Sequence, residues 1–68
     1  MADIQALASK AAMQWHAKPD DRSLLRFYNI TDQVAKGTGV RNRDDLKRIT
    51  RDIRKVAEHS FDMKPNRG

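Results

Sequence analysis

The stretch RNRDDLKRITRDIRKVAEHSF, residues 41–61, largely determines the fold expected for this chain of 68 residues. Asn42 followed by Asp45 is typical of a helix start, because a short polar side chain can accept the first free backbone amides. The pattern predicts a helix over about residues 42–61. The apolar residues within it recur at the three- and four-residue intervals of one helical face, and they are Leu46, Ile49, Ile53, Val56, Ala57 and Phe61.

Two further helices are predicted on the N-terminal side of this stretch. Asp3 can cap a helix over about residues 3–17, which Pro19 ends because the residue before a proline avoids helical geometry. The doublet Asp20-Asp21 can cap a second helix over about residues 21–36. The inner faces of these two helices are predicted to contain Ile4, Leu7, Ala8, Ala11 and Trp15, and then Leu24, Phe27, Tyr28, Thr31, Val34 and Ala35.

The connection before the third helix contains two glycines. Gly37 is expected to end the second helix in a left-handed conformation, and Gly39 completes a short turn. Pro65 prevents a helix from continuing near the C-terminus. We therefore predict an all-α protein, a small three-helix bundle formed by a single domain over residues 1–63, followed by a short disordered tail over residues 64–68.

Length and composition narrow the classes of function. A chain of 68 residues buries little apolar surface, so a self-sufficient enzyme with a deep pocket is not expected. No cysteine is present, and two distant histidines do not form a metal site, so neither a metal nor a cofactor is predicted. No serine has a predicted base beside it, so no catalytic residue is assigned. No segment could span a bilayer, and the default expectation is a cytoplasmic protein without membrane association.

Positive charge is concentrated in residues 41–55. This segment holds seven basic and three acidic residues, a net +4 of the chain's net +5. On a helical projection, Lys47, Arg51, Arg54 and Lys55 fall on one outward strip, and Arg48 borders it. The predicted binding surface adds the two arginines at the helix start, and its residues are Arg41, Arg43, Lys47, Arg48, Arg51, Arg54 and Lys55.

Three explanations of this basic strip are open at the level of sequence. It can be an ordinary solvated face, since Asp44 with Arg48, Arg48 with Asp52 and Arg54 with Glu58 are favourable pairs four residues apart. It can bind the phosphates of a nucleic acid, or it can dock on an acidic protein. The last two are favoured because Lys47, Arg51 and Lys55 follow one another as like-charge neighbours, each repulsion costing about 0.2 to 0.5 kcal/mol that an external anion would offset.

Residues 32–40, DQVAKGTGV, resemble the first helix and turn of helix-turn-helix DNA-binding domains. Ala35, Gly39 and Val40 match the alanine, the turn glycine and the small apolar residue of that motif. Leu46 and Ile49 come one residue later than its next two core positions. The resemblance covers about a quarter of the chain and implies that the third helix enters the major groove of DNA.

The sequence leads to two hypotheses of function. The first is a small non-catalytic nucleic-acid-binding protein of bacterial, plasmid or phage type that uses the basic strip against DNA or RNA phosphates. The second is a protein-interaction module of phage or plasmid type, an inhibitor, adaptor or small subunit that docks on an acidic face of a larger assembly. The line from Leu46 to Val56 also has coiled-coil spacing, which is compatible with a homodimer or with a seam inside one chain.

Overall fold

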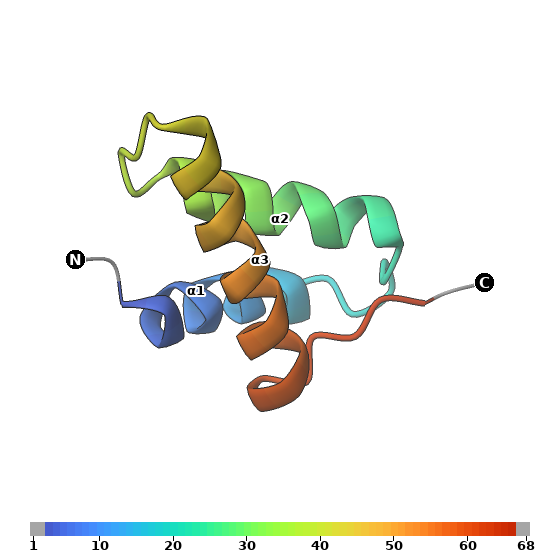
Figure 1. The fold of residues 1–68 in the computed structure, drawn as a ribbon. Coiled ribbons are helices and arrows are strands. Elements are labelled where there is room, and N and C mark those ends of the chain that lie inside the picture. Colours follow the sequence, from blue (N-terminus) through green and yellow to red (C-terminus); the bar gives the residue numbers. More distant parts are fainter. Residues whose placement is uncertain (1–2, 67–68) are drawn as a thin grey trace.

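Three helices form the protein in a computed structural model that describes residues 3–66. They are α1 (Ile4–His16), α2 (Leu24–Lys36) and α3 (Arg43–Ser60). Each helix packs against both of the others, and α3 crosses α1 and α2 (Figure 1). The predicted all-α three-helix bundle is confirmed. Residues 1–2 and 67–68, which belong to the predicted domain and tail, lie outside the described residues.

Side chains cap the start of every helix. Asp3 accepts a hydrogen bond from the amide of Gln5, as predicted, and Asn42 accepts bonds from the amides of Asp44 and Asp45. Because these amides have no partner within their own helix, the caps fix where α1 and α3 begin.

The predicted cap of α2 is wrong. Ser23, rather than Asp20-Asp21, accepts the amide hydrogen bond of Arg26, and α2 therefore begins at Leu24. Asp21 instead accepts a bond from the amide of Ser23 and shapes the loop before the helix. Serine and aspartate are both good caps, so local sequence did not decide between them.

The predicted conformation of Gly37 is also wrong. Gly37 has φ −65° and ψ −13°, which is right-handed helical geometry, whereas Gly39 has φ +82°. Of these two glycines, Gly39 therefore occupies the left-handed region that favours glycine. The connection between α2 and α3 covers residues 37–42, and it is longer than the three- or four-residue turn typical of helix-turn-helix motifs.

The core is built around one tryptophan. Trp15 of α1 is 1% exposed and meets the ring of Phe27 edge to face, with the ring centroids 5.9 Å apart. Its indole N–H has no hydrogen-bond partner among residues 3–66. Ile53 and Ala57 of α3 are fully buried in the same cluster, and the alanines of α1 allow close approach of the helices.

The chain after α3 returns to the bundle. Asp62 has φ +53°, and after this reversal Met63 is completely buried while its amide donates to the carbonyl of Ala57. Residues 64–66 form no helix, and the amide of Asn66 donates to the carbonyl of Arg22 at 2.7 Å. The segment after Met63 thus lies beside the connection between α1 and α2 (Figure 1).

Two aromatic or apolar positions of α2 differ from their predicted inward placement. Tyr28 is 42% exposed and Leu24 is 39% exposed. Ile30, which is not among the predicted inner residues, is buried. The face of α2 that contacts the bundle is therefore rotated from the one drawn by periodicity, because α1 and α3 approach α2 from the side of Phe27, Ile30 and Val34.

Candidate anion-binding cleft

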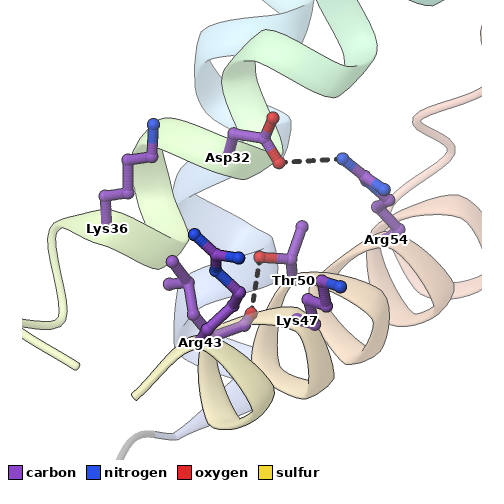
Figure 2. Close-up of a pocket in the computed structure, with 7 residues that line it drawn as sticks. Asp32, Lys36, Arg43, Lys47, Thr50 and Arg54 are labelled. Carbon is purple, nitrogen blue, oxygen red and sulfur yellow. Dashed lines mark hydrogen bonds and ion pairs between the residues drawn. The ribbon is translucent and has the colours of Figure 1, made fainter. Parts of the chain in front are cut away.

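A cleft of about 490 Å³ lies between α2 and α3. Figure 2 shows that the side chains of both helices meet across it. From α2 come two residues one helical turn apart, Asp32 and Lys36. From α3 come Arg43, Leu46, Lys47, Thr50 and Arg54.

Helical spacing explains why these residues share one cleft. Arg43, Lys47 and Arg54 are separated by four and seven residues, so they project from the same flank of α3. This flank borders the buried line of the helix, and Thr50, 7% exposed, lies at the border. The hydroxyl of Thr50 donates back to the carbonyl of Leu46 at 2.8 Å. The wall of the cleft is therefore part of the same rigid helix that builds the core.

Arg54 joins α3 to α2 at one end of the cleft. Its Nη2 atom is 2.9 Å from Oδ1 of Asp32, and its Nε atom donates to the hydroxyl of Thr31 at the same distance. Its guanidinium carbon also lies 4.4 Å from the centroid of the Tyr28 ring. The Arg54 side chain is 31% exposed. These contacts make Arg54 chiefly a structural residue, because two of its five N–H donors and one face of its guanidinium are already engaged.

The remaining cations of the cleft are unpaired within the part of the chain that the structure describes. Lys36, Arg43 and Lys47 have no carboxylate within 4.0 Å among residues 3–66. Asp32, which forms the ion pair with Arg54, supplies the carboxylate that lines the cleft. Three cations around one concave surface, none of them paired with a carboxylate of residues 3–66, produce a positive potential there, which favours an anion such as phosphate.

The structure divides the predicted binding residues into two groups. Arg43, Lys47 and Arg54 line the cleft. Four other predicted residues are exposed outside the cleft, and these are Arg41, Arg48, Arg51 and Lys55. Arg51 and Lys55 follow Lys47 by one and two turns, so the exposed cations extend the cleft along the outer side of α3.

The favourable pairs predicted along α3 are not formed. Within residues 3–66, ion pairs join Arg54 to Asp32 and Lys64 to Asp62, and none joins two residues of α3. Arg54 turns to α2 instead of Glu58. The predicted repulsion along Lys47, Arg51 and Lys55 therefore has no nearby carboxylate to relieve it among the described residues.

Lys36 was missed by sequence reasoning. It follows Asp32 by one turn and ends α2, immediately before the connection to α3. A short connection places the end of one helix close to the start of the next, so Lys36 and Arg43 could have been expected near each other. Lys36 could thus have been predicted from the short connection between the two helices, but not from the local density of charge in the sequence.

The N-terminus of α3 does not offer its amides to an anion. The side chain of Asn42 accepts bonds from the amides of Asp44 and Asp45, at 2.9 and 3.3 Å. The carboxylates of Asp44 and Asp45 are exposed beside it. Capping therefore occupies the amides of Asp44 and Asp45, and any anion is left to the side chains.

No helix in the described part of the chain combines the length and apolar character needed to cross a membrane. Within residues 3–66, no group of three or more histidine, aspartate or glutamate side chains is arranged to hold a metal ion. Comparison with protein-family models, curated proteins and solved structures finds no match to this chain. The assignment of a function therefore depends on the geometry and charge of the cleft.

Proposed function

We propose that this protein is a small non-catalytic nucleic-acid-binding protein that holds phosphate groups in the cleft between α2 and α3. The observation that carries the proposal is the convergence of Lys36, Arg43 and Lys47 on one concave surface without a neutralising carboxylate among residues 3–66. A phosphate held there gains charge-assisted hydrogen bonds and relieves repulsion among the three cations.

The exposed cations outside the cleft support a polymer rather than a single small anion. Arg51 and Lys55 continue from Lys47 along α3, and Arg48 and Arg41 add exposed positive charge on the same helix and before it. A row of cations matches a row of phosphates, since each contact displaces a counterion from the nucleic acid. On this proposal Lys36, Arg43, Lys47, Arg51 and Lys55 contact phosphates, while Arg54 holds the wall of the cleft.

The test is the salt dependence of binding to fluorescently labelled DNA and RNA oligonucleotides, measured by anisotropy. Engagement of about four phosphates predicts a slope of log affinity against log salt of about −3 to −4. The double variant Lys47→Glu with Arg51→Glu should bind more weakly and reduce the magnitude of that slope by about 2.

A matched control separates position from total charge. Lys10→Glu with Lys18→Glu changes the net charge equally at two exposed lysines of α1 and the following loop, which do not line the cleft. This control should retain most of the affinity and nearly the full slope. Equal losses in the two double variants would mean that binding reflects net charge alone, and the proposed site would be rejected.

An acidic protein partner is the second candidate, and exposed apolar side chains favour it. Leu25 of α2 is 70% exposed and Leu24 is 39% exposed, so two apolar side chains of the first turn of α2 are accessible to a protein partner. Two results would favour this candidate over the first. The protein would show no detectable binding to DNA or RNA at low salt, and it would recover one acidic protein in stoichiometric amount. The Lys47→Glu, Arg51→Glu variant would no longer recover that protein.

A further inference from the structure

Tyr28 lies on the surface beside the cleft, although periodicity placed it inside. The residue is 42% exposed, and its ring meets the ring of Phe27 edge to face, with centroids 5.9 Å apart and an interplanar angle of 70°. The guanidinium of Arg54 lies 4.4 Å from its centroid. The ring is thus held in place by two neighbours while a substantial part of it remains open to solvent.

The position of Tyr28 continues the line of the cleft. Tyr28, Asp32 and Lys36 follow one another at four-residue intervals along α2, so Tyr28 and Lys36 are about 12 Å apart along the helix axis. Arg54 contacts both Tyr28 and Asp32. Figure 2 shows Arg54 turned toward Asp32, with Lys36 further along α2. The Tyr28 ring therefore lies against Arg54, at one end of a cleft that is also lined by Lys36, Arg43 and Lys47, and these three have no carboxylate within 4.0 Å among residues 3–66.

Cationic grooves bordered by aromatic rings are typical of proteins that bind single-stranded nucleic acid. The cations follow the backbone, and exposed bases stack on the rings with little regard to sequence. In a duplex the bases are already stacked on one another and are unavailable to such a ring. The combination of Tyr28 with the cleft therefore favours a single strand.

The start of α3 argues against reading a duplex through its grooves. Helices that enter the major groove contact base edges with their N-terminal residues. In this protein Asp44 and Asp45 are exposed at that position, and their carboxylates would approach the phosphates. Arg43 and Lys47 line a cleft between two helices, where a single backbone can enter more readily than a double helix.

We infer that the partner is a single-stranded nucleic acid whose phosphates occupy the cleft between α2 and α3 while one base stacks on Tyr28. This inference rests on the proposed function and adds the strandedness of the ligand and the residue that contacts a base. It assigns Tyr28 to the binding site and leaves Arg54 as the residue that positions its ring.

The experiment compares four ligands of equal length and label at one salt concentration. They are a twelve-residue oligothymidylate, an abasic strand with the same number of phosphates, a twelve-residue oligouridylate and a DNA duplex. The unsubstituted protein should bind the two strands that carry bases more tightly than the abasic strand and the duplex. Loss of one stacked base should lower affinity by about 5- to 100-fold.

Variants of Tyr28 identify the stacking residue. Tyr28→Ala should weaken binding of oligothymidylate by about 5- to 100-fold and leave binding of the abasic strand nearly unchanged, whereas Tyr28→Phe keeps the ring and should retain the affinity. Leu25→Ala is the matched control, because Leu25 is also an exposed apolar residue of α2 but lines a different hollow, together with Asp21 and Arg26. It should bind both strands like the unsubstituted protein.

The outcomes distinguish the inference from the proposed function. If the abasic strand or the duplex binds as tightly as oligothymidylate, or if a folded Tyr28→Ala variant keeps its affinity, stacking is wrong although the phosphate site stands. If Tyr28→Ala does not fold, NMR of the unsubstituted protein tests stacking instead. The Tyr28 ring resonances should shift on adding oligothymidylate but not on adding the abasic strand, and equal shifts with both would contradict stacking. If none of the four ligands binds at low salt, both the inference and the proposed function fail.

Discussion

Two arginines of this protein, Arg26 of α2 and Arg54 of α3, lie over aromatic rings, and their surroundings differ. At the closed end, where the chain after α3 meets α1 and the start of α2, Arg26 lies 5.0 Å from the centroid of Trp15. It donates to the carbonyl oxygens of Gln14, Lys18 and Asp21. In the cleft, Arg54 lies over Tyr28 and is paired with Asp32, but other cations near it have no partner among the described residues.

This difference shows that some positively charged side chains stabilise the fold, as Arg26 does, whereas others, which line the cleft, remain available to bind a ligand. Arg26 donates to carbonyls at the end of α1 and in the loop that follows it, so its guanidinium is engaged within the fold. The closed end is completed by His16, whose Nε2 atom donates to the carbonyl of Phe61 at 3.0 Å, and by the buried Met63. Lys36 and Lys47 have no comparable structural contact in residues 3–66, and this distinguishes the cleft as a candidate binding surface.

The largest expected effect is the loss of the buried methionine at the closed end. Met63→Ala should lower the free energy of unfolding by about 2–5 kcal/mol, because it removes a fully buried side chain and leaves a cavity. Denaturant unfolding followed by circular dichroism measures this change. Lys64→Ala, at the exposed next residue, should alter stability by no more than about 0.5 kcal/mol. Equal effects of the two substitutions would mean that the closed end is not sealed by Met63.

The prediction of the fold succeeded where the signals were local. The three helices, the caps Asp3 and Asn42 and the burial of Trp15 follow from short-range patterns of polar and apolar residues. Such patterns fix which segments are helical and where a cap can stand. They do not fix the rotation of one helix against its neighbours, and Tyr28 was therefore placed inside.

The cleft was only partly predictable for the same reason. Charge density along α3 indicated Arg43 and Lys47, but the contribution of Lys36 depends on the approach of α2. Arg54 was assigned to the binding strip because it lies seven residues after Lys47 and therefore on the same face of the helix. Its ion pair with Asp32 could not be predicted, since it depends on the packing of α2 against α3. The burial of Met63 likewise requires the chain to reverse direction at Asp62, and the sequence has no glycine at that position to indicate a turn.

Arg54→Met tests whether Arg54 belongs to the fold rather than to the binding surface. It should lower the free energy of unfolding by about 1–2 kcal/mol, since it leaves Asp32 and Thr31 without this partner, and the partial exposure of the ion pair limits the loss. Arg54→Lys should recover only part of this stability, because an ammonium cannot reproduce the forked geometry.

Arg51→Met is the matched control for Arg54, since it removes an exposed arginine of α3 that has no carboxylate within 4.0 Å among residues 3–66. Its unfolding free energy should change by no more than about 0.5 kcal/mol, while its affinity for nucleic acid should fall. A stability loss as large for Arg51→Met as for Arg54→Met would contradict the division between structural and available arginines.

Among the variants of the Arg54–Asp32 pair, Asp32→Asn is expected to have the smallest effect on stability. It also gives the most direct test of whether phosphates bind in the cleft or on the outer face of α3. The amide oxygen can still accept a hydrogen bond from Arg54, and the pair is partly exposed, so the loss of stability should be below about 1 kcal/mol. The substitution also removes the carboxylate lining the cleft, and affinity for an oligonucleotide should rise by about two- to fivefold at low salt. Asp45→Asn removes an equal charge at an exposed position of α3 outside the cleft and should raise affinity less. Because both variants gain the same net charge, a larger gain for Asp32→Asn locates the bound phosphates in the cleft, and an equal or larger gain for Asp45→Asn moves them to the outer face of α3.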